Sequence, residues 1–171
     1  MQEGYAERLD PSVHLAAVDE EAWPLIERWP AAPHVREWWG PTVQVLKELK
    51  SHTLEEMAMI CCDGQPTGLL AWQVPTQKEL AEAGLEDLPE DLVDIDVMIG
   101  EMDWVGKGIG QEALRQLFHR LRAKGVPLVG MAAEVANERS IRCITGLGLA
   151  PWRDFVEEGK LYRYFVLRLS V

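Results

Sequence analysis

The chain has 171 residues, of which 47% are hydrophobic and 26% are charged, and its formal net charge is −11. These values predict one globular domain over residues 1–171, and no apolar run is long enough to cross a membrane. Because nucleic acids and anionic membranes attract basic surfaces, the charge argues against both as partners. It would attract a small cationic substrate, although an acidic surface can serve solubility alone.

The first third of the chain is expected to form a short strand and two helices. The strand falls near residues 5–9, and a helix with acidic residues at its N-terminus covers residues 19–29 until Pro30 ends it. Residues 37–40 are expected to form a loop, and a second helix begins at Pro41. The apolar positions at helical spacing are Trp23, Ile26, Trp29, Val45, Leu46 and Leu49.

A hairpin and an acidic segment come next. Residues 57–62 and 67–74 are typical of strands, and the Asp63-Gly64 pair between them is typical of a tight turn. Two interpretations of the following segment, residues 75–91, remain open. It is either the solvated face of a loop or short helix over the sheet, or an acidic lid over a substrate, because binding loops sit on rigid scaffolds. Its acidic residues are Glu79, Glu82, Glu86, Asp87, Glu90 and Asp91.

The stretch from Val93 to Gly110 combines a strand pattern with a glycine-rich turn. Ile95, Val97 and Ile99 alternate with Asp94, Asp96 and Met98, as in a half-buried strand. The turn at 106–110 follows, and an amphipathic helix then runs to Lys124, where Gly125 caps it. This order of strand, glycine loop and helix aims free backbone N–H groups at a phosphate.

The glycine spacing distinguishes among phosphate-binding loops. A P-loop is excluded, because five residues separate Gly100 from Gly106 and a glycine follows Lys107. A dinucleotide-binding turn requires a different glycine spacing directly after the strand, although Glu134 falls where its ribose-binding acid would lie. A glycine turn that binds nothing is the remaining alternative.

The last third of the chain is expected to hold a strand, a helix and a closing hairpin. The strand covers residues 127–133, the helix residues 137–147, and the hairpin residues 152–157 and 161–169. The three cysteines show no metal-ligand spacing, and no metal is expected; they indicate reduced thiols in a cytoplasmic protein. No signal peptide is evident.

Two of these segments resemble the signature motifs of the GCN5-related N-acetyltransferases (GNAT). Val105–Gly110 resembles the family's pyrophosphate loop, Arg/Gln-x-x-Gly-x-Gly/Ala, except that Val105 replaces Arg or Gln. Asn137–Ile144 resembles the Asn-x-x-(Ala/Ser)-Ile-Arg motif. More narrowly, the segments 36–40, 95–101 and 141–143 resemble the aminoglycoside 6′-N-acetyltransferase branch. The resemblance implies an α/β (α+β) fold with a mixed, mostly antiparallel sheet of six to seven strands and about four helices.

The resemblance also implies a ternary complex in which acetyl-CoA transfers its acetyl group directly to the 6′-amine of an aminoglycoside. The residues it implies for binding acetyl-CoA are Met98, Ile99, Gly100, Val105, Gly106, Lys107, Gly108, Ile109, Gly110, Asn137 and Arg142. Those expected to contact the cationic substrate are Trp38, Trp39, Asp94, Asp96 and Glu134. Lys107 can equally be an exposed loop lysine, and both tryptophans can equally be core residues.

Asp96 aligns with the strand aspartate that serves as the catalytic base in this branch. Alternation places it on the same strand face as Asp94. A carboxylate needs a raised pKa to act as a base, and a neighbouring carboxylate such as Asp94 can raise the pKa of Asp96. Its alternative role is to anchor the ammonium group by charge. In the family a tyrosine often protonates the leaving thiolate, but Ile144 stands at its position here. The remaining alternatives are that Tyr162 or Tyr164 donates the proton, or that the thiolate leaves without a proton donor.

Two rival functions remain open. One is acylation of a hydroxylamine-bearing siderophore precursor or another small amine, and the other is binding of coenzyme A without turnover. The expected assembly is a monomer or a homodimer.

Overall fold

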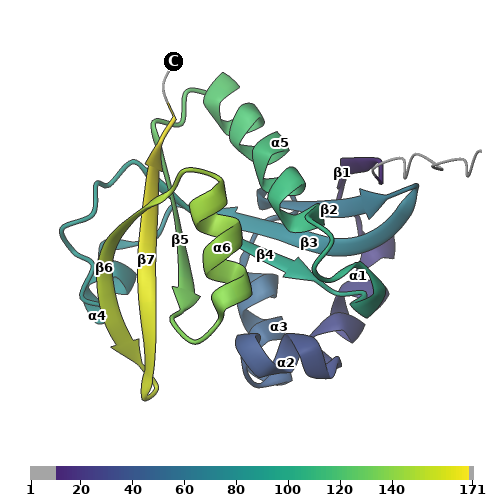
Figure 1. Ribbon diagram of the computed structural model, residues 1–171, viewed down its shortest axis with the longest axis horizontal. Coiled ribbons are helices and arrows are strands. Elements are labelled where there is room, and N and C mark those ends of the chain that lie inside the picture. The colour runs from purple at the N-terminus through teal and green to yellow at the C-terminus, as the bar shows by residue number, and fades with distance from the viewer. Residues whose placement is uncertain (1–10, 170–171) are drawn as a thin grey trace, which may run out of the picture.

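The computed structural model describes residues 11–169, and its centre is a seven-stranded sheet in the order β1-β2-β3-β4-β5-β7-β6 (Figure 1). The strands are β1 (Val13–Ala17), β2 (Met57–Cys62), β3 (Gln65–Gln73), β4 (Leu92–Ile99), β5 (Leu128–Glu134), β6 (Ala150–Glu157) and β7 (Lys160–Arg168). The α-helices are α1 (Trp23–Arg28), α2 (Pro33–Trp39), α3 (Thr42–Ser51), α4 (Gln77–Glu82), α5 (Ile109–Ala123) and α6 (Glu138–Gly146).

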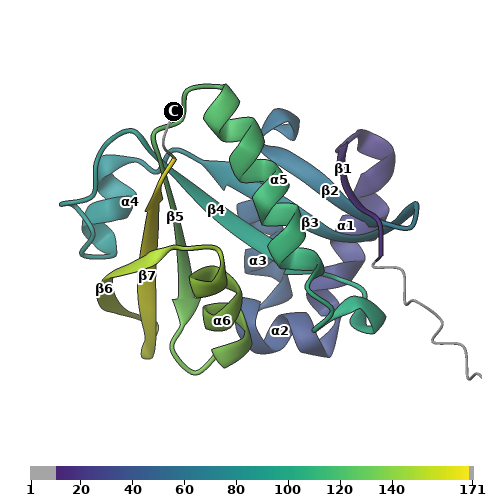
Figure 2. The same cartoon turned by 45° about the horizontal axis from the view of Figure 1, so that its top comes forward.

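The separation of β4 from β5 is the main irregularity of the sheet. Among the described strands this pair alone is parallel, and its register covers only Leu92–Asp94 against Leu128–Gly130. Beyond Asp94 the two strands diverge, as Figure 2 shows, while β4 stays paired with β3 as far as Ile99. The second half of β4 therefore has an open backbone edge toward β5.

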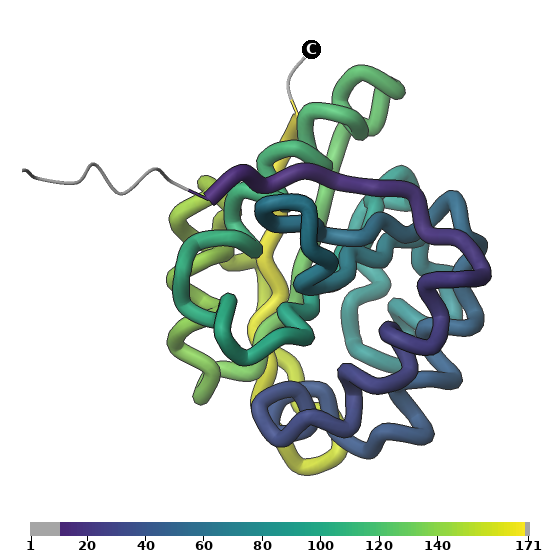
Figure 3. Tube along the Cα trace, turned by 90° about the vertical axis from the view of Figure 1, so that its right-hand side faces the viewer, coloured from purple at the N-terminus to yellow at the C-terminus, as the bar shows by residue number. Residues whose placement is uncertain are grey.

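The two faces of the sheet carry different helices. Helices α5 and α6 cover one face, where Ile95, Val129 and Phe165 join the buried residues of α5. Helices α1 to α3 pack on the opposite face around Trp29 and Met98. The α4 segment and its flanking leucines cover the other end of that face, around Leu92, Leu128 and Tyr164. The β6–β7 hairpin extends toward the same end of the molecule as α2 and α3 (Figure 3).

The sequence predicted the mixed, mostly antiparallel sheet correctly, and both hairpin turns adopt the expected geometry. Asp63 and Gly64 have φ of 50° and 78°, and Glu158 and Gly159 have φ of 50° and 77°. The strand predicted near residues 5–9 lies outside the described residues.

Of two further local predictions, one is wrong and the other is confirmed in part. Residues 37–39 belong to α2 rather than to a loop, because Pro33 begins a helix at its first position and Gly40, at φ 88°, ends it. The segment 75–91 contains a short helix, α4, which is one of its two expected forms, and its buried Leu80, Leu85 and Leu88 pack it against the sheet.

Candidate active site

A cavity of about 820 Å³ opens where β4 and β5 separate. It runs from α2, past the end of β4 and the glycine loop, to the first turns of α5 and α6. The sequence-predicted cofactor residues that line it are Met98, Ile99, Val105, Gly106, Gly108, Ile109, Gly110, Asn137 and Arg142, and both Trp38 and Trp39 also line it. The structure thus brings together residues that are up to about 100 positions apart in the chain.

The glycine loop forms one end of this cavity. Gly106 and Gly108 have φ of 76° and 78°, a left-handed conformation that glycine adopts without strain. Gly108 is the N-cap of the 15-residue α5. The first N–H groups of a helix lack partners within it, and the helix dipole adds positive potential there. The loop can therefore bind a pyrophosphate through its backbone.

Lys107, which was expected in the same loop, does not line the cavity. Its ammonium group lies over the Trp104 ring, 5.2 Å from the ring centroid. This cation–π contact favours the interpretation of Lys107 as a loop lysine that packs on Trp104 rather than as a ligand of the phosphates.

The end of β4 is fixed by contacts from two other segments. The N–H groups of Gly100 and Glu101 both donate to the Thr67 carbonyl, at 2.8 and 3.1 Å. A side chain at Gly100 would overlap the Trp29 ring, so Gly100 allows a close approach and does not itself line the cavity. On the open edge, the His34 ring Nε2 lies 2.9 Å from the Ile99 carbonyl oxygen.

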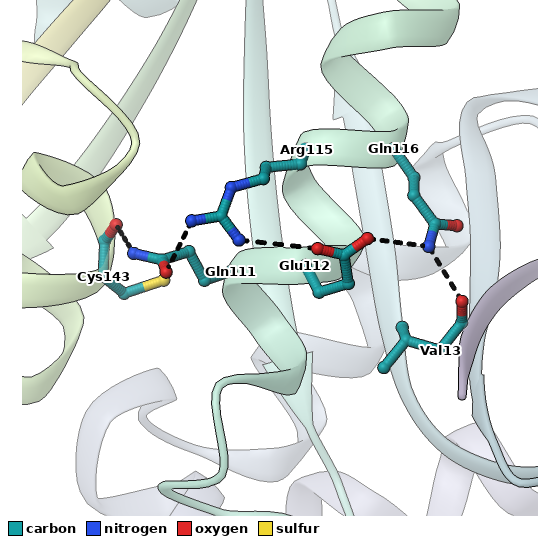
Figure 4. Close-up of polar contacts among 6 residues, drawn as sticks. All are labelled: Val13, Gln111, Glu112, Arg115, Gln116 and Cys143. Carbon is teal, nitrogen blue, oxygen red and sulfur yellow. Dashed lines mark hydrogen bonds and ion pairs between the residues drawn. The ribbon is translucent and has the colours of Figure 1, made fainter. Parts of the chain in front are cut away.

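Helix α6 forms the opposite wall. Asn137 caps it by accepting a hydrogen bond from the Ser140 N–H at 3.2 Å. Gln111 of α5 donates to the Cys143 carbonyl at 3.2 Å and also accepts from Arg115 at 2.9 Å. Figure 4 shows this chain of polar contacts continuing along α5 through Glu112 and Gln116 to Val13 in β1. These contacts hold α6 against the helix that carries the glycine loop.

Three other predicted residues line the cavity, one from an exposed and two from half-buried positions. The Arg142 side chain is 72% exposed, and its Nη1 lies 3.8 Å from Glu138. This leaves the guanidinium free to contact a phosphate group. Trp38 and Trp39 are both half-buried, and Trp39 also packs against the α1–α3 core.

Asp94 and Asp96 lie on the sheet face opposite α5. On this face the apolar cluster around Met98 and the one around Leu92 are separate, and the two aspartates lie between them in β4. Asp94 is half-buried and Asp96 is exposed. The alternation predicted from the sequence is confirmed, and the pair lies beside the point where β4 loses its β5 partner.

The surroundings of this pair raise both carboxyl pKa values. Burial and the nearby Asp96 raise the pKa of Asp94 well above its usual range, against a hydrogen bond from Tyr164 that lowers it. Although part of Asp96 is exposed, desolvation by the protein around its carboxyl raises its pKa to about 6, while His52 lowers it and Glu48 raises it. Because Asp96 keeps an exposed surface, water can reach a carboxylate that the protein nonetheless keeps partly protonated near neutral pH.

Further carboxylates surround this face. Burial raises the pKa of Glu48 in α3, and Glu157 and Glu158 at the tip of the β6–β7 hairpin raise it further. Glu134, at the end of β5, pairs in register with Tyr162, and its Oε2 lies 3.9 Å from Lys160. Glu134 is not among the residues that line the 820 Å³ cavity. By strand alternation it lies on the same sheet face as Asp94.

The position of the missing tyrosine is apolar in the structure. Ile144 is 1% exposed and belongs to the core beneath α6. The hydroxyl of Tyr164 is bonded to Asp94 at 2.7 Å, on the carboxylate side of the sheet. A thiol has a pKa of about 8.5, so its thiolate is a good enough leaving group to depart without a proton donor.

Several residues of the site were not predicted from the sequence. His34, Glu48, His52 and Thr67 act through contacts between segments far apart in the chain. The spacing of His34 in a helix beginning at Pro33 could have placed it beside Trp38, since residues four apart share a helix face.

The Acetyltransferase (GNAT) domain family matches residues 19–156 of this chain. Among solved structures, the aminoglycoside acetyltransferase AAC(6')-Ib in complex with coenzyme A and kanamycin has a TM-score of 0.75 and 22% identity, over 92% of this chain and 95% of that one. An aminoglycoside N(6')-acetyltransferase from Legionella pneumophila has a TM-score of 0.69 and 16% identity, over 95% of each chain. The ribosomal L7/L12 α-N-protein acetyltransferase RimL has a TM-score of 0.69 and 12% identity, over 92% and 90%. These likenesses show a common fold.

No curated protein sequence matches the chain significantly. Within residues 11–169, no group of three or more metal-ligating side chains is present, and no helix has the length and apolarity to cross a membrane.

Proposed function

This chain belongs to the acetyltransferase (GNAT) domain family and is an acetyl-CoA-dependent acetyltransferase, and we propose that its acceptor is a primary amine of a small polycationic molecule. The expected acceptor is the 6′-amine of an aminoglycoside. The observation that carries this proposal is the position of two carboxylates, Asp94 and Asp96, on one face of β4 where its pairing with β5 ends.

The residues present fit the donor. The cavity reaches the N-terminus of α5, and Gly106 and Gly108, which have positive φ and open space at their Cβ positions, leave the loop amides accessible. The exposed guanidinium of Arg142, which pairs with Glu138, lies on the same wall. We propose that the loop and Arg142 bind the phosphates, and that the open edge of β4 near Ile99 pairs with the pantetheine amides.

The acidic sheet face supports a cationic acceptor. Asp94 and Asp96 are flanked by Glu48 from α3 and by Glu79 from the α4 segment, whose charges raise the pKa values of the pair. Each unpaired carboxylate in such a group becomes more stable when an ammonium group binds beside it. The net charge of −11 adds long-range attraction for the same kind of molecule.

Acetyl-CoA supplies the activated acetyl thioester in this reaction. The acceptor approaches from the acidic face, and Asp96 first attracts its ammonium group and then takes a proton from it, directly or through water. With acetyl-CoA bound, backbone N–H groups at the open end of β4 would stabilise the negative charge that develops on the carbonyl oxygen, a contact worth about 3 kcal/mol. Direct transfer in a ternary complex requires no covalent relay, and burial raises the pKa values of Cys61 and Cys62, which disfavours either as a nucleophile.

The test is free-thiol release from acetyl-CoA by the purified protein over a panel of aminoglycosides, linear polyamines and hydroxylysine. Release with aminoglycosides, and none with hydroxylysine, is the expected result. Release with hydroxylysine alone would favour the siderophore-precursor reaction. Calorimetric binding of acetyl-CoA with no thiol release from any amine would favour a coenzyme-binding module and contradict the proposed acceptor.

The three cysteines bear on the proposed location. All are free thiols in the described part of the chain, which supports a reducing, cytoplasmic compartment.

A further inference from the structure

Tyr164 is a buried tyrosine whose hydroxyl reaches a carboxylate two strands away. It belongs to β7, is 4% exposed and packs among the leucines under the α4 segment. Its hydroxyl lies 2.7 Å from Asp94 Oδ1 in β4, although β5 lies between these two strands. A hydrogen bond of this kind must pass over the intervening strand.

Gly130 of β5 makes that reach possible. It pairs with Asp94 on one side and with Val166 on the other. A Cβ atom at Gly130 would overlap the ring and hydroxyl of Tyr164. The φ of Gly130 lies outside the left-handed region, so its backbone does not require glycine. The missing side chain therefore serves the passage of Tyr164 to Asp94.

The groups that face the two carboxyls come from four elements. Asp94 faces Asp96 in its own strand, Glu79 in α4 and Tyr164 in β7. Asp96 faces Glu48 and His52, both at the C-terminal end of α3 or just beyond it. Among these neighbours of Asp94, Tyr164 alone favours its ionised form, because the other two are carboxylates.

The direction of the hydrogen bond follows from the surroundings of the phenol. Burial and the neighbouring Asp94 carboxylate raise the pKa of Tyr164 above its usual value. The phenol therefore stays protonated and donates, which stabilises a negative charge on Asp94.

We propose that Tyr164, with its ring lying across the side-chain-free Gly130, is a positioning residue that fixes Asp94 beside Asp96 and presents the acceptor ammonium group with two carboxylates. This rests on the proposed acetylation of a cationic amine. Without the hydroxyl, Asp94 keeps its proton to a higher pH, and the acceptor meets Asp96 alone.

The test compares the pH dependence of kcat/KM for the acceptor in wild type and in the Tyr164→Phe variant, which keeps the ring packing. The acid limb that Asp94 contributes, which lies above the Asp96 limb near pH 6, is expected about one pH unit higher in the variant, because a hydrogen bond to a charged group is lost. At pH 7 its KM for the acceptor should rise about tenfold while kcat changes less than about twofold, and the two enzymes should converge at alkaline pH.

Two further variants separate positioning from general damage. Gly130→Ala keeps the hydroxyl but blocks its path, and it is expected to shift the acid limb in the same direction. Thr42→Val removes a hydroxyl that donates to the Pro30 carbonyl rather than to either aspartate, and its acid limb is expected to coincide with that of wild type. A uniform loss of activity at every pH in Tyr164→Phe, or an unshifted acid limb, would overturn the proposal.

A second measurement needs no turnover. Carbon-13 NMR of labelled aspartate carboxyls follows the titration of the Asp94–Asp96 pair directly, and its upper midpoint should rise in Tyr164→Phe. An unchanged midpoint would refute the positioning role even if the enzyme is active. If no amine is acetylated, the proposed function fails, while a shifted midpoint still supports Tyr164 as the group that orders this pair.

Discussion

Replacing Asp96 by asparagine removes the proposed base while keeping the size and polarity of the side chain. Proton transfer by a positioned side chain contributes about 100- to 10,000-fold, so kcat is expected to fall by about that factor. The KM for acetyl-CoA should change less than about twofold, because Asp96 does not line the 820 Å³ cavity.

The pH dependence adds a quantitative signature. The pKa of Asp96 is raised to about 6, so in wild type the base is lost as pH falls through that value. Wild-type kcat/KM should therefore drop about tenfold for each pH unit below about 6, and the residual rate of Asp96→Asn should lack that limb.

The assay is initial-rate thiol release at saturating acetyl-CoA from pH 5 to 9. Asp91→Asn is the matched control, because it makes the same chemical change at an exposed residue just before β4. Equal kcat in Asp96→Asn and wild type at every pH would refute the base assignment. A raised KM for the acceptor with an unchanged kcat would instead assign Asp96 to anchoring the ammonium group.

Three further predictions follow from the same geometry. Gly108→Trp should abolish calorimetric binding of acetyl-CoA, whereas Gly84→Trp, at another exposed glycine with positive φ, should leave it intact; equal affinities would contradict the loop assignment. Gly100→Ala should lower the free energy of unfolding by about 1–3 kcal/mol in urea titrations, because the new methyl group overlaps Trp29, and unaltered stability would contradict that close packing. Raising the salt concentration from about 0.05 to about 0.5 M should increase the KM for a polycationic acceptor more than that for a monoamine, and equal responses would contradict steering by the acidic face.

The central strand, glycine loop and helix were predictable because each carries a local signal. Alternating apolar residues specify β4, the positive-φ glycines specify the loop, and an amphipathic pattern specifies α5. Local alternation also predicted that Asp94 and Asp96 share a face. These signals depend on neighbouring residues in the chain, and so a single sequence contains them.

The α2 segment shows why other features were missed. A loop was expected at residues 37–40, after Pro30 ends the preceding helix, whereas Pro33 occupies the first turn of a new helix. The preceding residues reach Pro33 through a short 3-10 turn at 29–31, and no composition signal separates that turn from a loop. The tryptophans that were expected in a loop consequently lie on a helix beside the cavity.

The partners of the acidic pair could not be predicted for a different reason. Tyr164 reaches Asp94 only because β7 pairs with β5, and Gly130 permits it only because of the register of those strands. Glu48 approaches Asp96 from a helix on the same sheet face. Contacts of this kind depend on the order of strands in the sheet, which short-range patterns do not specify.

The most direct test of the account is a crystal structure of the protein with coenzyme A and an aminoglycoside that it acetylates. We expect the pyrophosphate on the amides of residues 106–110, the pantetheine arm in the opening between β4 and β5, and the reactive amine within hydrogen-bond reach of Asp96, directly or through one water. An amine bound away from Asp94 and Asp96, or phosphates bound away from the glycine loop, would contradict it.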